Sequence, residues 1–242
     1  DSKHEREWVR NQLPEVNVLE VPNNPLLYKK TLFESAHFNK LTLSEEDKVR
    51  PVLYEIEKKR KLSKNKSTNL EEYIISLKMK ITISEINDQS IHRTSQLLNK
   101  VNQFNLTTKR YNENNLLKLK EEGYIIYTIR VEDKFGDTGL TGVIIIQPLP
   151  NKIWKIDSFL LSCRVLGRNI EKIILNFISK KLIKINGQTI LGEYIPSKKN
   201  MLVKDLYKSL DFQKSSNNTW LWKINKGLIY DNNICEIIET DD

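Results

Sequence analysis

Three β-rich runs at hairpin spacing lead directly into one long helix, and this order constrains the fold more than any other feature of the chain. The runs span Tyr124 to Val131, Thr141 to Gln147 and Trp154 to Cys163, and the helix spans Gly167 to about Lys184. Apolar and β-branched runs at this spacing are typical of consecutive strands. A further strand, Thr189 to Ile195, follows the helix. Helices that interrupt a mostly antiparallel sheet define an α+β fold.

The sequence predicts further elements on both sides of this core. Helices are expected at Glu5–Arg10, Leu26–Phe33, Thr42 to about Lys61, Leu70–Leu77, Gln89–Val101, Asn112–Glu121 and Asn200–Leu210, and strands at Val18–Val21, Lys80–Ile86, Thr219–Ile224 and near Phe212. The periodicity of apolar residues and the capping residues carry these assignments. The expected fold is a sandwich-like α+β domain. Its mixed, mostly antiparallel sheet would have six to seven strands flanked by helices, after a small helical and extended segment.

The chain is basic, but unevenly so. It has 39 Lys and Arg against 31 Asp and Glu, a net charge of +8, while Asp231–Asp242 holds five acidic residues and no basic one. A basic body favours an acidic partner, such as nucleic acid, a phosphorylated cofactor or an acidic protein. The run Lys58–Lys66 contains six basic residues. It indicates either a linker between domains or the solvated end of a helix.

Several classes of protein and site are excluded. The longest apolar runs, such as Gly142–Ile146, are far shorter than the ~20 residues that cross a bilayer. No leader for secretion is recognisable, so we expect a cytoplasmic protein with no membrane partner. The two cysteines, Cys163 and Cys235, and the three histidines are too few for a disulfide framework or a structural zinc site. We therefore expect no metal.

The segment Ile156–Glu171 carries most of the predicted chemistry. A strand ends there in a short turn, and the turn leads into the long helix. Backbone N–H groups in such a turn, together with the helix dipole, form a site for a pyrophosphate or phosphodiester. Gly167 allows close approach of the backbone, and Arg164 and Arg168 add fixed positive charge. The turn is therefore the predicted anion site.

The pattern Arg164-x-x-Gly167-x-Asn169 resembles the Arg/Gln-x-x-Gly-x-Gly/Ala phosphate loop of the GNAT superfamily of N-acetyltransferases. In that superfamily the loop follows the fourth strand and opens the third helix, and a later helix carries a tyrosine before a Leu-Gly-Phe. Here Tyr207 precedes a Leu-Asp-Phe, with Asp211 where glycine is usual. Aspartate can adopt the left-handed conformation at a helix end. The resemblance implies the GNAT fold, with CoA or a phosphopantetheine thioester as the cofactor.

Four motifs narrow the resemblance to FkbH-like proteins. They are the Asn-Gln-Phe-Asn-Leu-Thr-Thr run at Asn102–Thr108, Asp133–Val143, Leu161–Arg168 and Gly192–Asn200. They occur in the family's order and cover about Gln96 to Phe212. FkbH-like proteins join a haloacid-dehalogenase (HAD)-like domain to a C-terminal GNAT-like domain, and are associated with loading a glyceryl unit onto an acyl carrier protein in polyketide biosynthesis. The resemblance implies an acyl carrier protein and an upstream HAD-like domain as partners.

The N-terminal residues resemble the end of that HAD-like domain. Asp1 matches the second acid of its last metal-binding motif, but Ser2 and Lys3 replace the expected Asn-Pro, and the nucleophile motif Asp-x-Asp-x-Thr is absent. A complete phosphatase or glyceryl-loading site is therefore not expected. The expected divisions are 1–40 for the HAD-like remnant, 41–68 for a helix and basic linker, 69–230 for the GNAT-like domain and 231–242 for an acidic tail.

The resemblance places the cofactor's phosphate on the turn, and its thioester along the edge where the fourth and fifth strands splay apart. The expected cofactor-binding residues are Ser162, Cys163, Arg164, Val165, Gly167, Arg168, Asn169 and Asn200. Asn200 is equally explained as the N-cap of the next helix. The residues expected to shape the acceptor substrate are Asn102, Phe104, Asn105 and Thr107.

Four residues are candidates for catalysis. Tyr207 matches the GNAT tyrosine that acts as general acid to the leaving thiolate, or it is a core aromatic residue. Cys163 is either an acyl-accepting nucleophile, since arginine and a helix N-terminus favour a thiolate, or a buried small residue. Asp157 and Glu193, on the two adjoining strands, are the candidate base or substrate-orienting carboxylates, or they face solvent. The histidines have no partner that spacing identifies.

Two functions from different classes follow. The first is acyl transfer, in which a small acyl group moves to or from a pantetheine thiol by direct attack and a strand-four N–H stabilises the oxyanion. The second is a non-catalytic docking module that holds the carrier protein for a HAD-like domain. Asn169 in place of the third glycine and the lack of a clear base favour it. Nucleic-acid binding rests on charge alone and ranks behind both.

Overall fold

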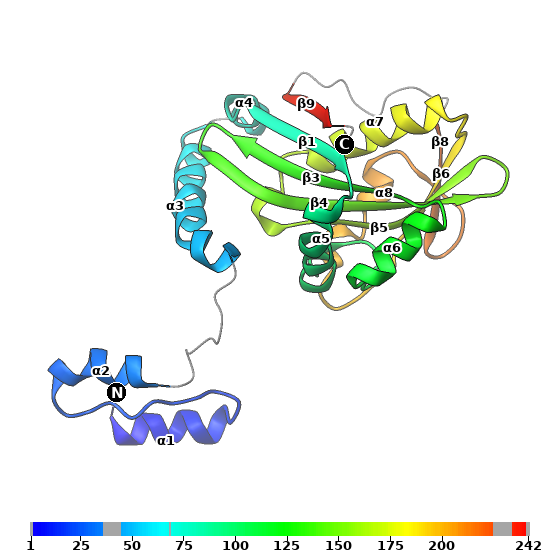
Figure 1. Ribbon diagram of the computed structural model, residues 1–242. Helices are drawn as coiled ribbons and strands as arrows, with labels where there is room; N and C mark the ends of the chain where they lie inside the picture. Colours follow the sequence, from blue (N-terminus) through cyan, green and yellow to red (C-terminus); the bar gives the residue numbers. More distant parts are fainter. Residues whose placement is uncertain (1, 36–44, 68, 225–233, 241–242) are drawn as a thin grey trace. The chain divides into compact units, whose positions relative to one another are not determined.

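The computed structural model describes residues 2–35, 45–67, 69–224 and 234–240 (Figure 1). The chain forms two compact units, Asp1–Pro51 and Val52–Asp242. In the first unit, helix α1 (Lys3–Gln12) is followed by η1 (Pro25–Leu27) and α2 (Tyr28–Glu34). The helices predicted here are confirmed.

The N-terminal unit contains no strand among its described residues. Val18–Val21, predicted as a strand, is irregular. Glu20 instead forms ion pairs with Arg6 and Arg10 of α1, at 3.1 and 2.6 Å. A lone extended segment has no neighbour with which to share backbone hydrogen bonds, so side-chain pairing to the helix takes their place.

Helix α3 (Glu45–Lys66) is longer than the sequence indicates. Its predicted end lies near Lys61, but the helix continues through most of the basic run Lys58–Lys66. Lysine and arginine are good helix formers, and the run contains neither glycine nor proline, so nothing ends the helix earlier. The run is therefore helical rather than an unstructured linker. The predicted N-cap at Thr42–Ser44 lies outside the described residues.

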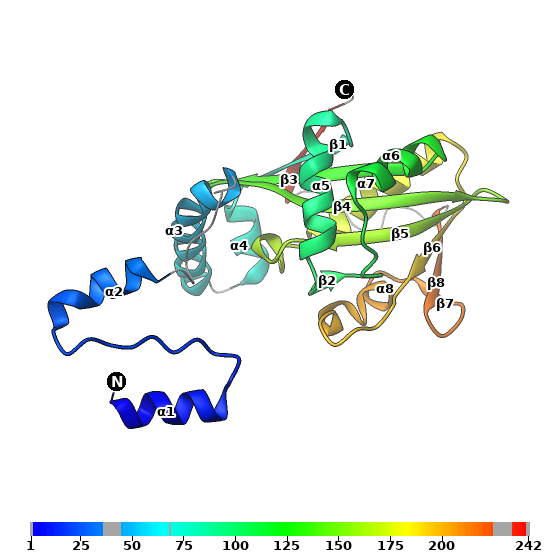
Figure 2. The ribbon, with the colours of Figure 1, turned by 60° about the horizontal axis from the view of Figure 1, so that its bottom comes forward.

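The second unit is built on one mixed sheet (Figures 1 and 2). Its strands are β1 (Met79–Glu85), β2 (Phe104–Asn105), β3 (Ile125–Asp133), β4 (Gly136–Leu149), β5 (Ile153–Leu161), β6 (Thr189–Glu193), β7 (Gln213–Lys214), β8 (Thr219–Lys223) and β9 (Cys235–Thr240). They lie in the order β7-β8-β6-β5-β4-β3-β1-β9, and β2 pairs with β5. β5–β6 and β1–β9 are parallel, and the other pairs are antiparallel. The α+β class and the mixed, mostly antiparallel sheet are confirmed.

The helices of this unit cover both faces of the sheet. They are α4 (Leu70–Ser76), α5 (Asp88–Lys100), α6 (Glu113–Glu121), α7 (Ile170–Lys184) and α8 (Leu206–Ser209), with 3₁₀ turns η3 (Cys163–Val165) and η4 (Met201–Val203). Ile144 and Ile146 of β4 pack in one core cluster with α7, whereas Val143 and Ile145 pack in a second cluster with α5 and α6. Because successive strand residues point to opposite faces, α7 lies on one face and α5 and α6 on the other (Figure 1).

The sheet has nine strands, whereas the sequence predicts six or seven. One of the strands that the sequence analysis did not predict is β9. The C-terminal residues are predicted as an acidic tail, but Cys235–Thr240 pair in parallel with β1. Cys235 and Ile237 pack against the core, and Glu239 forms an ion pair with Lys181 of α7. Glu236 and Glu239 therefore lie on a strand whose apolar residues are half-buried, and the other acidic residues of the predicted tail lie outside the described residues. The predicted helix at Asn200–Leu210 is also broken, into η4 and α8.

A buried carboxylate joins three elements of this unit. Asp133, at the end of β3, accepts hydrogen bonds from the Arg60 guanidinium of α3 at 2.6 and 2.9 Å. It also accepts one from Arg168, just before α7, at 3.1 Å. Glu57 lies 3.5 Å from Arg60 and 3.9 Å from Arg168 and balances the second positive charge. Arg60 and Arg168 are almost fully buried, so each depends on this pairing for its solvation.

Replacing this carboxylate is expected to destabilise the protein strongly. Asp133→Asn leaves two buried guanidinium groups without their anion, and we expect the free energy of unfolding to fall by about 3 kcal/mol. Asp137→Asn is the matched control, since its pair with Arg130 is partly exposed and should contribute at most about 1 kcal/mol. Urea unfolding followed by tryptophan fluorescence measures both. Equal losses in the two variants would contradict the role of Asp133.

Candidate functional site

The turn between β5 and α7 has the backbone shape of an anion site. η3 (Cys163–Val165) follows β5, and Gly167 and Asn169 both have positive φ, 73° and 58°. Nothing lies within 4 Å of the position that a Cβ on Gly167 would take, so conformation rather than crowding requires glycine there. Asn169 is the N-cap of α7 and makes no side-chain cap. Asn169 therefore supplies no side-chain partner to the first N–H groups of α7, while the Glu171 carboxylate, whose pKa is raised by burial, bonds its own N–H.

The two arginines of the turn are already used inside the protein. Arg168 pairs with Asp133, and burial lowers its pKa from the ordinary value. Arg164 donates to the Thr138 carbonyl at 3.1 Å and to the Ser162 hydroxyl at 3.3 Å. The expectation that both project their charge to a bound phosphate is therefore wrong for Arg168. The turn offers backbone N–H groups rather than a pair of free cations.

The other expected residues of the turn divide between surface and core. Cys163 is exposed, which excludes the buried-residue alternative for it and leaves its role as a nucleophile a prediction. Val165 is fully buried and anchors the turn to the main core. Ser162 is also buried, and its hydroxyl accepts from Arg164. These contacts hold the turn in place and leave Cys163 and Gly167 at its surface.

β5 and β6 pair only along part of their length. Their parallel register runs from Ile153 opposite Thr189 to Ile156 opposite Gly192, and then the strands separate. We call this point the fork. Asp157 is the next residue of β5, and the β4–β5 register shifts there because Ile145 pairs with Ser158 and Ile146 with Ile156. Asp157 is thus an extra residue in β5, a bulge of the kind that re-aims side chains next to functional sites.

The Asp157 carboxylate is buried and well satisfied. It accepts hydrogen bonds from the Lys109 ammonium, from the Tyr111 hydroxyl at 2.7 Å and from the Ser158 hydroxyl at 3.2 Å. Burial, and then the bond to Asp157, raises the pKa of Tyr111 well above its ordinary value. The prediction that Asp157 faces solvent is therefore wrong. With three donors around it, this carboxylate is an electrostatic anchor rather than a free base.

Glu193 lies across the fork from Asp157. It ends β6, and its carboxylate lies 2.7 Å from the Lys155 ammonium of β5. Both side chains are about one-fifth exposed, so this ion pair can be reached from solvent. Together with Lys109 and Tyr111, these residues form a polar cluster at the fork on the side of α6.

The chain's own residues fill the fork. β2 pairs antiparallel with β5, Phe104 with Leu161 and Asn105 with Leu160. The Leu106 N–H donates to the Phe159 carbonyl at 3.1 Å. The edge of β5 along which the resemblance places a thioester is therefore occupied. Figure 2 shows β2 beside β5 at this point.

The predicted substrate-shaping residues have structural roles here. Phe104, Asn105 and Thr107 are buried. The Asn105 side chain accepts from the Thr108 N–H at 2.9 Å, and Asn102 accepts from Arg110. None of the three buried residues presents an open surface to an acceptor. Only Asn102 lies at the exposed end of this turn.

The Asn200 side chain does not cap η4. It forms hydrogen bonds to the residues that fill the fork. Its amide donates to the Asn105 carbonyl at 2.8 Å and to the Ile195 carbonyl at 3.0 Å. Its oxygen accepts from the Ser197 N–H at 2.7 Å. The residue is fully buried. Asn200 therefore stands at the N-cap position of η4, as one interpretation predicts, although its side chain makes no cap, and its role as a cofactor ligand stays a prediction.

Tyr207 is the unsatisfied group of the site. Its ring packs on Gly192, where a Cβ would approach ring atoms to 2.4 Å, and on Phe212 with ring centres 5.0 Å apart. Its hydroxyl approaches the main chain of Glu193, which acts to lower its pKa, but it reaches ordinary hydrogen-bond geometry with none of the described residues. Burial raises the pKa of this phenol far above its ordinary value. A buried polar group without a partner is rare and requires an explanation, of which a catalytic role is one.

Some residues of the site could not be singled out from sequence. Lys109, Tyr111 and Lys155 reach the carboxylates only through the bulge and the fork, and Arg60 lies in a basic run that looks solvated. The only signal is the motif at Asp133, which contains the carboxylate but gives no indication of its two arginine partners. His92, left without a partner by spacing, contacts Glu113 at 2.7 Å on an exposed surface.

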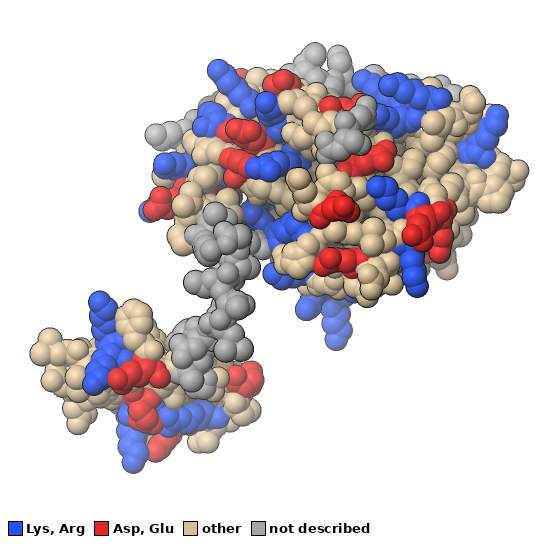
Figure 3. Space-filling view, in the orientation of Figure 1, with Lys and Arg blue, Asp and Glu red and all other residues tan. Residues whose placement is uncertain are grey.

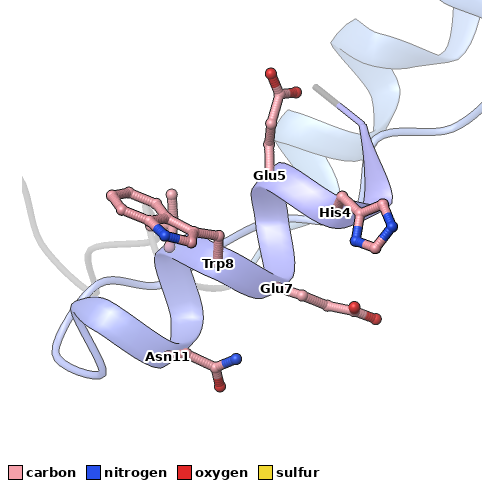
Figure 4. Close-up of a pocket in the computed structure, with 6 residues that line it drawn as sticks. His4, Glu5, Glu7, Trp8 and Asn11 are labelled. Carbon is pink, nitrogen blue, oxygen red and sulfur yellow. The ribbon is translucent and has the colours of Figure 1, made fainter.

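Two hollows lie elsewhere. The hollow in Figure 4 is lined by His4, Glu5, Glu7, Trp8, Val9 and Asn11, all on α1, and is an open surface of one helix. The second, of about 480 Å³, lies over β1 and β3 beside the start of α5 and is lined by polar residues such as Ser84, Arg93 and Arg130. Neither hollow includes a residue of the fork or of the turn before α7.

Charge on the visible face does not form one basic stripe. Figure 3 shows lysine and arginine intermixed with aspartate and glutamate over the larger unit. Within the described residues, no group of three or more His, Cys, Asp or Glu side chains could hold a metal ion. Across the same residues, no helix combines the length and the apolar character that crossing a membrane requires.

Comparisons with known proteins return GNAT-family acetyltransferases among solved structures. No protein-family model and no curated protein sequence matches the chain. One similar structure is a GNAT-family acetyltransferase from Staphylococcus aureus, 13% identical, with a TM-score of 0.46, covering 60% of this chain and 99% of that one. Spermidine N-acetyltransferase from Vibrio cholerae, in complex with CoA and spermine, is 11% identical with a TM-score of 0.46, covering 60% and 96%. An IAA acetyltransferase from Bacillus cereus is 14% identical with a TM-score of 0.41, covering 56% and 79%. Likenesses this distant carry no argument about activity.

The residues present meet part of what a phosphopantetheine thioester needs. The turn before α7 offers backbone N–H groups, and Tyr207 offers an unpartnered hydroxyl at the fork. The β5 edge between them is taken by Phe104–Leu106. Such a group therefore fits only when that segment has left the fork.

Alkaline titration tests the burial of Tyr207. Its pKa is raised in the folded protein, whereas in the unfolded chain a phenol ionises near pH ~10. Unfolding therefore becomes more favourable as pH rises above about 10, and Tyr207→Phe should move the alkaline unfolding midpoint upward. At neutral pH this variant should lose no stability, because no hydrogen bond is removed. Tyr111→Phe should lose about 1 kcal/mol, because Asp157 loses a donor. Reversible ionisation of Tyr207 near pH ~10 in the folded protein would contradict this burial.

Proposed function

We propose that the Val52–Asp242 unit transfers an acyl group from or to a pantetheine thiol, with Tyr207 as the general acid. The buried, unpartnered phenol at the fork carries this proposal. In a core that needed only bulk, phenylalanine would fill the same space without an unsatisfied hydroxyl. This hydroxyl stays protonated, as a general acid must before it acts, and contact with the bound thioester would have to bring its pKa down toward that of the leaving thiol.

Each part of the site has a role in this reaction. The thioester, when bound, supplies an acyl carbon activated toward attack. The N–H groups at the start of α7 bind the phosphate, and Gly167 lets the backbone approach it. Tyr207 gives its proton to the leaving sulfur and regains, through water, the proton that the acceptor loses. Asp157 and Glu193, each paired with a lysine, orient the acceptor by charge.

The finer proposal is an FkbH-type role. The four motifs resemble that family, and the net charge of +8 suits an acidic carrier protein. We propose that the thioester is borne by the phosphopantetheine of an acyl carrier protein, and that the acyl unit is a glyceryl or similar small group loaded for polyketide biosynthesis. A HAD-like domain would supply that unit.

A second candidate is a docking module without catalysis. The filled β5 edge favours it, since Phe104–Leu106 take the place that the thioester would need. In this role the unit holds a carrier protein on its surface while another domain performs the chemistry. The two candidates differ in whether an acyl group is transferred at the fork.

The test is intact-protein mass spectrometry with the whole chain, a holo carrier protein and a panel of acyl-CoAs that includes acetyl and glyceryl groups. We expect an acyl mass on the carrier that depends on the protein. Tyr207→Phe should lower the rate about 100-fold with stability retained. Tyr127→Phe, at a buried tyrosine of β3, is the matched control and should leave the rate unchanged.

The remaining outcomes are distinct. Acylation of the protein itself, lost in Cys163→Ala, would assign Cys163 as a covalent intermediate. Carrier binding with no mass change on either protein would favour the docking module. Full activity in Tyr207→Phe would remove Tyr207 from the mechanism.

A further inference from the structure

Residues Phe104–Thr107, which we call the fork segment, bridge the two separated strands. The Leu106 N–H donates to the Phe159 carbonyl of β5 at 3.1 Å, and the Leu106 carbonyl accepts from the Ile195 N–H, beyond β6, at 2.8 Å. The Thr107 hydroxyl donates to the Asp157 carbonyl at 2.9 Å. The segment therefore satisfies, as an extra strand would, the backbone groups that separation of β5 and β6 leaves open.

The Asn200 side chain holds the fork segment on the side that faces the chain after β6. The Asn200 amide donates to the Asn105 carbonyl and to the Ile195 carbonyl, and so ties the fork segment to the chain that follows β6. Phe104 packs edge-on to Phe159 with ring centres 5.6 Å apart. Phe104 and Leu106 are also buried in the main core, so release of the segment requires both side chains to leave that core.

The backbone is strained at the end of the fork segment. Thr108 has a φ of 54°, in the left-handed region. For a β-branched residue this conformation is a genuine outlier, and such strain concentrates at ligand clamps and switch regions. Release of the fork segment would allow Thr108 to return to an ordinary conformation. The strain therefore favours opening, and the Asn200 and Thr107 hydrogen bonds oppose it.

We propose that the fork segment is a displaceable internal occupant of the thioester slot, and that Asn200 is its latch. An extended chain of amides, such as the pantetheine arm, offers the same kind of backbone-like donors and acceptors to the β5 edge as Phe104–Leu106 do. Binding of the arm thus exchanges one strand-like partner for another, and the slot is closed to water between turnovers. This inference rests on the proposed acyl transfer and adds its regulation.

Hydrogen exchange tests the displacement without any ligand. The Leu106 and Ile195 amides should exchange through local opening, at least about 100-fold faster than the Ile144 amide in the centre of β4. Thr107→Val removes the hydrogen bond to Asp157 and should speed the Leu106 amide about tenfold relative to Ile144. Thr138→Val, which removes a similar buried bond to the Val131 carbonyl, should leave that ratio unchanged. Equal exchange of Leu106 and Ile144 would overturn the proposal.

A reversible cross-link tests the link between opening and binding. The Thr107 and Ser158 hydroxyl oxygens are 3.4 Å apart, so Thr107→Cys with Ser158→Cys can form a disulfide that locks the fork segment. Ser84→Cys with Thr240→Cys, whose oxygens are 2.5 Å apart, is the matched lock between β1 and β9. The probe is the desulfo form of CoA, which has no thiol that could reduce the disulfide, and its binding to the whole chain is measured by titration calorimetry, with peptide mapping to confirm each disulfide.

The expected result is at least about tenfold weaker desulfo-CoA binding in the oxidised fork lock, restored by reductant. The β1–β9 lock should bind desulfo-CoA equally in both states. Unchanged desulfo-CoA binding in the oxidised fork lock would overturn the proposal and leave acyl transfer intact. If no form binds desulfo-CoA or a holo carrier protein, acyl transfer fails, and the exchange rate of Leu106 still decides whether the fork segment opens.

Discussion

The second unit depends on one buried carboxylate that neutralises two arginines from distant parts of the chain. Asp133 holds Arg60 of α3 and Arg168 of the turn before α7 within hydrogen-bond distance. Charges removed from water are stable only when they are paired, so this contact fixes where α3 and α7 begin to pack. It also withdraws Arg168 from the surface, so this arginine is not available to an anion bound at the turn.

At the fork, too, buried polar groups must find partners. Here the partners occupy the place that a ligand would need. Separated strands leave backbone groups that must find partners, and the fork segment supplies them. The same contacts that stabilise the sheet close the slot that a thioester would use. Tyr207 is the exception, since its hydroxyl stays unpartnered beside the fork. Acyl transfer and passive docking therefore differ in one physical property, the free energy required to move Phe104–Thr107.

The polar cluster at the fork is balanced rather than exposed. Asp157 is held by Lys109 and Tyr111, and Glu193 by Lys155. These charge-assisted contacts hold the two carboxylates and their lysine partners in a fixed pattern of charge. The bulge at Asp157 is the feature that brings this carboxylate to Lys109 and Tyr111.

The sequence by itself determined most of the helices and strands between Leu70 and Lys223, the α+β class and the turn before α7, because local periodicity, capping residues and glycine placement act within a few residues. It also identified Tyr207, Asp157 and Glu193, which the structure places around one fork. Only the tertiary structure decided that β9 joins the sheet, that Arg60 and Arg168 share Asp133, and that Phe104–Leu106 fill the fork. These are contacts between residues far apart in the chain, whose geometry depends on packing and strand register, and no local pattern encodes either.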